Sequence, residues 1–269
     1  MKKKKAVKQL DKLWKGMKSH LKTFLKTNSQ DDLHQFRVHV KKLKALLTLY
    51  ASEPENKGLL HKFKPVKTVF KAAGDIRNAQ INLQLGEKHQ LQDENFNQHQ
   101  QQILQQGTEA FKSQGKSYLK RLKKAHIALQ NNLHKLQGKT IRNFYKDKLD
   151  QVAIFFTAPT FDEAMHTARK NIKLLIYNQK ASAEALYGKL RINADYLNQL
   201  QDKIGQWHDH LLTMEVLSAM NQPDNQAIIN LKNSNAALEL EILELAANFR
   251  QKVSTAEDAA VKIVPETVV

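Results

Sequence analysis

The sequence predicts an all-α protein. Its 269 residues include only 9 Gly and 5 Pro, so turns are few and most of the chain should be helix. Apolar residues recur at three- and four-residue spacing along nearly the whole chain, and no stretch alternates apolar and polar residues as a half-buried strand does. Because 41% of the residues are hydrophobic, a chain of this length can bury a substantial core.

The chain is expected to begin with two helices. The first covers residues 2–27 and has a regular apolar stripe on one face. Ser29 then resembles the start of a capping box, with Asp32 in place of the usual Glu three residues later. The second helix follows this cap and is stopped by Pro54 after about residue 51.

Two longer segments complete the first half. A third helix is expected over residues 57–85, where Pro65 either kinks the helix or marks its true first turn. The Gln-rich stretch 91–137 is typical of one or two helices, with an interruption near Gly107 or Gly115.

The second half should start after Gly138, which we expect to end the first. Its helices are predicted at residues 139–156, 160–179, 182–220 and 224–252. Thr160 with Glu163 three residues later forms a full capping box for the second of these helices. Pro223 ends the third.

We expect a single domain over residues 1–253, with halves at about 1–138 and 139–253, and a flexible tail at 254–269. The absence of cysteine excludes disulfides, thiolate metal sites and cysteine nucleophiles. The N-terminal lysine run lacks the apolar core of a signal peptide, and no apolar stretch reaches the roughly 18 residues that span a bilayer. A soluble, cytoplasmic protein with no membrane partner is therefore expected.

The positive charge is concentrated at one end. The whole chain carries 43 Lys+Arg and 26 Asp+Glu, a formal net charge of +17. Residues 1–72 hold 19 of the basic and 5 of the acidic residues, whereas residues 204–269 hold 4 and 9. Such an uneven distribution indicates a basic surface for a polyanionic partner.

Two motifs occur twice. Each copy of the first places His, Arg and Lys at positions i, i+3 and i+7 of a predicted helix: His34, Arg37 and Lys41, then His166, Arg169 and Lys173. The second follows His34 after forty residues and His166 after thirty-nine, as Gly74-Asp75-Ile76-Arg77-Asn78 and Gly205-Gln206-Trp207-His208-Asp209. Repetition at nearly the same separation indicates a duplicated helical unit.

The basic stripe of the first motif runs beside the apolar stripe of its helix, where a helix meets its neighbours; a merely solvated lysine face would lie opposite the core. If the halves pair about a pseudo-twofold axis, both copies converge on one cleft. Two arginines can clamp oxyanions there and lysines add point charges, which suits a ligand with regularly spaced phosphates. Alternatively, Arg37 and Arg169 pair with Asp75 and Asp209, and the histidines are packing or capping residues.

The segment from His34 to Leu47 and the Gly74 motif resemble the signatures of the CHAD family, the histidine-bearing α-helical domains, with Asn78 in place of the family's Asp. The second copies resemble them too, so the resemblance spans about residues 31–217. It implies an all-helical fold of two pseudo-symmetric antiparallel bundle halves around a basic central cleft. It also implies non-catalytic binding of inorganic polyphosphate and association with polyphosphate granules.

Family members are often fused to a triphosphatase domain. No Glu-x-Glu-x-Lys segment of that kind occurs here, so a stand-alone member is expected, with no cofactor or metal. The residues expected to bind polyphosphate are His34, Arg37, Lys41, Lys44, Lys64, Lys67, Lys71, Arg77, His166, Arg169 and Lys173. In the second half, three of these lysines are replaced by Asp195, Asn198 and Asp202. Binding should therefore be weighted toward the first half. Binding should tighten below about pH 6.5 if the histidines become protonated on contact with the ligand.

Three other functions fit parts of the sequence. Nucleic acids share the phosphate backbone, although the aromatic residues mostly fit apolar stripes and leave no evident base-stacking platform. His208-Asp209-His210 resembles a ligand set of metal-dependent phosphohydrolases, but His208 and His210 lie about 200° apart on a helix and cannot easily share one metal. A helical scaffold that binds partners through its acidic C-terminal helix is the third.

Overall fold

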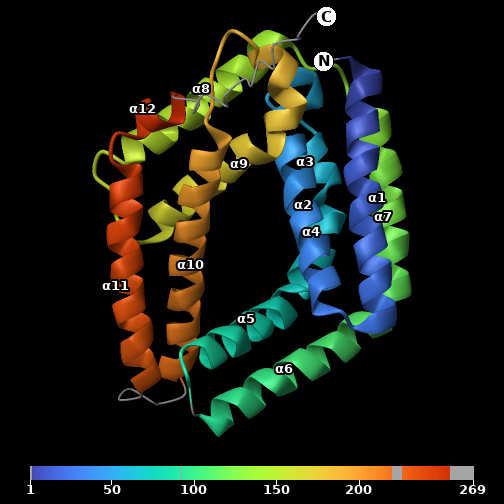
Figure 1. The fold of residues 1–269 in the computed structure, drawn as a ribbon. Coiled ribbons are helices and arrows are strands. Elements are labelled where there is room, and N and C mark those ends of the chain that lie inside the picture. The colour runs from blue at the N-terminus through green and yellow to red at the C-terminus, as the bar shows by residue number, and fades with distance from the viewer. Residues whose placement is uncertain (1, 92, 220–225, 255–269) are drawn as a thin grey trace, which may run out of the picture.

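The computed structural model describes residues 2–91, 93–219 and 226–254, and within these ranges its regular structure is entirely helical (Figure 1). The all-α prediction is therefore confirmed. In the first half the helices are α1 (Lys3–Thr27), α2 (Gln30–Tyr50), the 3₁₀ turn η1 (Pro54–Asn56), α3 (Leu59–Lys62), α4 (Lys64–Ala72), α5 (Gly74–Lys88), α6 (Glu94–Ser113) and α7 (Gly115–Asn132). They continue with α8 (Gly138–Phe155), α9 (Glu163–Leu186), α10 (Ala194–Ala219), α11 (Gln226–Ala246) and α12 (Phe249–Ser254).

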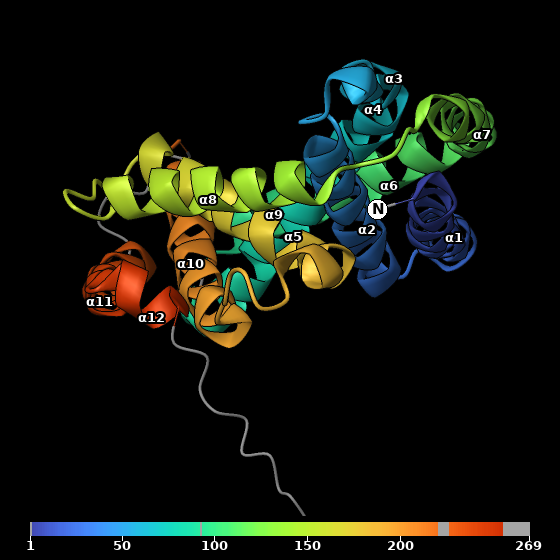
Figure 2. The same ribbon diagram turned by 90° about the horizontal axis from the view of Figure 1, so that it is seen from above.

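The helices that carry the repeated motifs contact one another in a closed order. The first motif lies on α2 and α9, the second lies on α5 and α10, and the contacts run α2–α9, α9–α10, α10–α5 and α5–α2. Each of these inner helices is backed by a chain neighbour: α2 by α1, α9 by α8, α5 by α6 and α10 by α11. Figure 1 shows these pairs along the four sides of a frame, and Figure 2 shows α1 and α7 on the side opposite α11 and α12.

Apolar burial holds the frame together. Leu10, Met17 and Leu21 of α1 are fully buried, as the sequence periodicity predicts. Together with buried residues from α2, α4, α7, α8, α9, α10 and α12 they belong to one continuous hydrophobic cluster, so both halves of the chain share a core.

Two buried polar contacts link the halves. Asn178 on α9 is fully buried and donates from Nδ2 to the Ala45 carbonyl on α2 at 2.9 Å. On the opposite side, the Thr213 hydroxyl on α10 donates to Asn82 Oδ1 on α5 at 2.9 Å, and Asn82 Nδ2 donates to Gln100 on α6. Because buried polar groups are costly unless they are hydrogen-bonded, these contacts favour one relative placement of the inner helices.

The predicted boundaries of the first half need one correction. Ser29 caps α2 as expected, since its side chain accepts a hydrogen bond from Asp32 N at 3.2 Å. The helix predicted over 57–85 is instead three helices, and Pro65 lies in the first turn of α4, where its missing N–H costs nothing. The Gln-rich stretch forms two helices with the break at Gly115.

The predictions for the second half were less accurate. The helix predicted over 139–156 is α8, which begins at Gly138, but Asp162, not Thr160, caps α9 by accepting from Ala164 N at 2.7 Å. The predicted break near residue 180 is wrong: α9 continues through buried Ser182 to Leu186, since the intervening residues include several good helix formers.

The predicted last helix is two helices. The chain turns between α11 and α12 at Asn248, whose φ is 56°. Of the tail predicted at 254–269, Ser254 is the last residue of α12, and 255–269 lie outside the described residues. In the part of the chain that the structure describes, no helix is both long and apolar enough to cross a membrane.

Candidate functional site

The arginines of the two copies make equivalent contacts. Arg37 on α2 donates from Nη1 to the Phe70 carbonyl at 2.8 Å, and Arg169 on α9 donates from Nε to the Gln201 carbonyl at 2.9 Å. Each acceptor lies four residues before the glycine of the second motif. The two repeated motifs are therefore joined in space: Arg169 binds α10, which carries the second motif, and Arg37 binds the end of α4, the helix directly before the second motif on α5.

The glycines leave room for these arginines. A Cβ atom added at Gly205 would collide with the guanidinium of Arg169, whose Cζ would lie 2.9 Å away. At Gly74 the Arg37 guanidinium is also the neighbour, but its Nη1 would lie 3.7 Å from an added Cβ, an ordinary contact. The second motif therefore requires glycine at Gly205, where an added Cβ would displace the Arg169 guanidinium, whereas a Cβ would fit at Gly74.

Neither arginine is neutralised by the acid that the sequence offered. Within the described chain, no carboxylate lies within 4.0 Å of the nitrogens of Arg37 or Arg169, so the proposed pairing with Asp75 and Asp209 is wrong. The Arg37 guanidinium instead lies over the Phe70 ring, 4.1 Å from its centroid. Both arginines are half-buried, and the carboxylates that favour their charged forms act from beyond ion-pair distance: Asp75 on Arg37, and Asp209 and Asp202 on Arg169.

Two lysines face these arginines. The side chain of Lys41 is open to solvent, but the surrounding protein still costs its ammonium part of its hydration, and Arg37 and Arg169 repel it; together they lower its pKa to about 8. Burial also lowers the pKa of Lys173 to about 8, again helped by Arg169 and by Lys41. Lys173 donates from Nζ to Gln201 Oε1 at 2.9 Å.

Arg77 on α5 belongs to the same group. Its pKa is lowered by burial, and it in turn lowers the pKa of Arg37, Lys41 and the imidazole of His34. We name Arg37, Lys41, Arg77, Arg169 and Lys173 the basic centre. Its members come from α2, α5 and α9, so the structure brings together the arginines and lysines of both copies of the first motif.

Asp209 lies near the basic centre and acts on Arg169 as a nearby negative charge, although the two form no close ion pair. Burial raises its pKa, while Arg169, His208, Lys41 and Arg77 oppose that shift, which shows that the carboxylate lies within the electrostatic reach of the basic centre. Asn78 occupies the equivalent position in the first motif. The two copies thus differ in charge at this position. That difference was visible in the sequence and indicated that Asp209 reduces the positive field of the basic centre.

The pKa values of both motif histidines are lowered in the free protein. Burial and then Arg77 lower the pKa of His34, and burial and then His208 lower that of His166 to about 4. The His166 ring lies against the ring of His208, with centroids 4.4 Å apart. Neither histidine caps its helix, because Ser29 and Asp162 do so. The lowered pKa values mean that, without ligand, both histidines take up a proton only at a lower pH than an ordinary imidazole does.

The remaining predicted lysines lie farther out. Lys44 is a neighbour of Lys67 and Lys170, which lower its pKa together with burial. Lys64 and Lys71 are exposed on the same face of α4 as Lys67, and no contact joins them to the basic centre. The lysines of α1 lie on a helix that backs α2 from outside.

The histidines around Asp209 diverge. His208 lies against His166, whereas the ring of His210 lies 5.2 Å from His89. Among the described residues, no three His, Asp or Glu side chains are grouped so that they could hold a metal ion.

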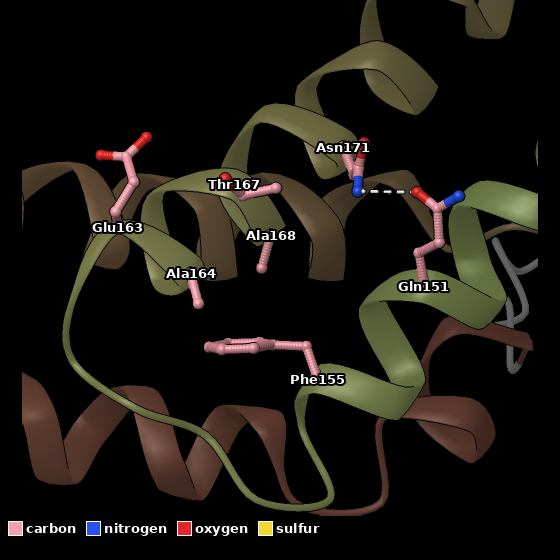
Figure 3. A pocket seen from close by; sticks show the side chains of 7 residues that line it. All are labelled: Gln151, Phe155, Glu163, Ala164, Thr167, Ala168 and Asn171. Atoms are coloured by element: carbon pink, nitrogen blue, oxygen red, sulfur yellow. Dashed lines mark hydrogen bonds between the residues drawn. The ribbon is translucent and has the colours of Figure 1, made fainter.

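A hollow of about 500 Å³ lies between α8 and α9 (Figure 3). Figure 3 shows Phe155 of α8 pointing across it toward Ala164 and Ala168 of α9. These alanines lie on the face of α9 opposite Arg169 and Lys173, so the hollow is separate from the basic centre.

The comparisons with known proteins agree with one another. The family model described as the CHAD domain matches residues 8–218. The crystal structure of the CHAD domain from the plant Ricinus communis superposes with a TM-score of 0.61 at 14% identity, covering 93% of this chain and 89% of that one. No curated protein matches significantly.

The two glycines give a matched pair of variants. Gly205→Ala should displace the Arg169 guanidinium and break its hydrogen bond to Gln201, whereas Gly74→Ala should leave Arg37 in place. The measurement is solvent exchange of the arginine Nε–H signals by NMR. We expect the Arg169 signal to lose most of its protection in Gly205→Ala; an unchanged signal would show that the glycine does not serve the arginine.

Proposed function

Because the chain belongs to the CHAD domain family, we propose that it binds inorganic polyphosphate at the basic centre, without catalysis, and associates with polyphosphate granules through that binding. The observation that carries the proposal is the convergence of three guanidiniums and two ammonium groups with no ion pair to any described carboxylate. Like charges held together in this way are stabilised by a polyanion.

The hydrogen-bond pattern leaves donors available for such a ligand. Arg169 uses Nε for the Gln201 carbonyl, so both of its Nη groups remain for phosphate oxygens. Arg37 uses Nη1 for Phe70 and keeps Nε and Nη2. Lys41 and Lys173 contribute mobile point charges between the two arginines, as a chain of closely spaced phosphates requires.

Lys44, Lys67, Lys64 and Lys71 supply a second, outer group of cations on α2 and α4. A linear ligand longer than the centre would pass from Lys41 to Lys44 and Lys67 at one end, while His34 lies beside Arg77, Lys41 and Arg37. The exposure of the outer lysines makes their individual contributions smaller and more sensitive to salt.

Nucleic acid is less well suited to this surface. Trp14 and Trp207 are 3% and 1% exposed, and Phe24, Phe36 and Phe63 are fully buried, so these aromatic residues cannot stack on bases. These buried aromatic residues therefore give the basic centre no surface on which a base could stack.

Competition between polyphosphate and DNA tests which polyanion the protein prefers. Labelled long-chain polyphosphate bound to the protein is challenged at ~0.15 M salt with polyphosphate, single-stranded DNA or duplex DNA at equal phosphate concentration. We expect unlabelled polyphosphate to displace the label and DNA to require at least about tenfold more phosphate. Equal displacement by DNA would contradict the proposal, and release of orthophosphate on adding Mg²⁺ or Mn²⁺ would contradict its non-catalytic part.

Asp209 gives the affinity a pH dependence. As the pH falls, the carboxylate takes up a proton at its raised pKa, one negative charge leaves the centre, and polyphosphate should bind more tightly. Asp209→Asn should bind about fivefold more tightly at pH 7.5, on the order of one screened charge interaction, and should lose the part of the tightening at low pH that Asp209 contributes. Isothermal titration at several pH values measures both effects. Equal affinity of the two proteins at pH 7.5 would remove Asp209 from the site.

A further inference from the structure

The amine of Lys41 has an unusual combination of surroundings. Its side chain is exposed, and in the described part of the chain neither a hydrogen bond nor an ion pair occupies its Nζ. The amine of Lys173, by contrast, is held by Gln201. A small molecule that enters the basic centre therefore meets one free amine.

That amine is surrounded by groups that bind phosphate. Arg37, Arg77 and Arg169 all act on the Lys41 ammonium, and Arg37 and Arg169 are fixed in orientation by backbone carbonyls. Guanidiniums fixed in this way can hold a phosphate group next to the amine.

We propose that Lys41 is a site of covalent acylation by small acyl phosphates, with the guanidiniums of the basic centre holding the phosphate. The lone pair of Nζ attacks the acyl carbon, a C–N bond forms, and the acyl C–O bond breaks. Orthophosphate leaves with that electron pair, and the proton lost from nitrogen passes to solvent. The product is an amide, and no oxidant or further reactant is needed.

The protonation state of the amine favours this chemistry. With a pKa of about 8, about a quarter of Lys41 is unprotonated at pH 7.5, compared with about one part in a thousand for an ordinary lysine. Lost hydration is the larger cause of this low pKa, and the arginines that would hold the phosphate lower it further.

A consequence, which rests on the proposed function, is regulation of polyanion binding. Acylation removes one positive charge from the middle of the basic centre, so the acylated protein should bind polyphosphate less tightly.

The test uses the unmodified protein and acetyl phosphate at pH 7.5, with quantitative mass spectrometry of each lysine. Exposed Lys15 of α1 is the internal reference. We expect Lys41 to be acetylated at least about tenfold faster than Lys15, and the preference to be smaller with a neutral acetylating ester that lacks phosphate. Equal rates for the two lysines, or an equal preference with both reagents, would overturn the proposal.

Two controls complete the experiment. Lys41→Arg keeps the charge and should abolish the fast acetylation without raising it at Lys173; transfer of the fast reaction to Lys173 would show that Lys41 is not the site. Adding polyphosphate should protect Lys41. If Lys41 is acetylated equally fast with and without polyphosphate, the proposed polyphosphate site is contradicted, whereas the acylation of Lys41 is still supported.

Discussion

The anchoring of two arginines on backbone carbonyls is the interaction on which the rest of the site depends. Arg37 binds a main-chain oxygen of α4 and Arg169 binds one of the inner helix α10, and each guanidinium lies near a glycine of the second motif. A carbonyl orients the guanidinium without cancelling its charge, whereas a carboxylate would do both. The fold therefore keeps a strong positive field where ion pairing would remove it.

Holding these cations together opposes folding, and the neighbouring packing offsets that cost. Lost hydration lowers the pKa of Lys41 and of Lys173, and repulsion by the neighbouring cations lowers each further, so the charged form of both side chains is disfavoured. The hydrophobic cluster shared by both halves, together with Asn178 between α2 and α9, keeps the helices in contact despite it. A bound polyanion would relieve the same repulsion, so ligand binding and stability should be linked.

The two halves contribute unequally. In the first, α4 and α5 are separate helices joined at Ala73, and α4 presents three lysines; in the second, the single helix α10 covers the corresponding stretch and carries Asp195, Asn198 and Asp202. Asp209 adds a further negative group opposite neutral Asn78. The positive field is thus graded from α4 toward α10, a difference that was readable in the sequence once the repeat was recognised.

The sequence predicted the helical class, the repeat and the family, because these depend on periodicity and motif spacing. It did not predict the end of α9 at Leu186, since a run of good helix formers carries no local stop before Gly188. Nor did it predict that the arginines bind backbone carbonyls, because a carbonyl acceptor has no sequence signature, unlike Asp75 and Asp209. The sequence also did not predict that Asp209 acts on the basic centre, because that depends on which helices contact one another.

The central claim is that the position of the charges, and not their number, creates the binding site. The direct measurement compares polyphosphate affinity, at one salt concentration, of two variants that each lose two positive charges: Lys41→Gln with Lys173→Gln, and Lys15→Gln with Lys22→Gln on α1. The account predicts that the first pair weakens binding by on the order of 30-fold or more and the second by less than about threefold. Equal losses would contradict it, because the bulk charge of the chain would then be sufficient.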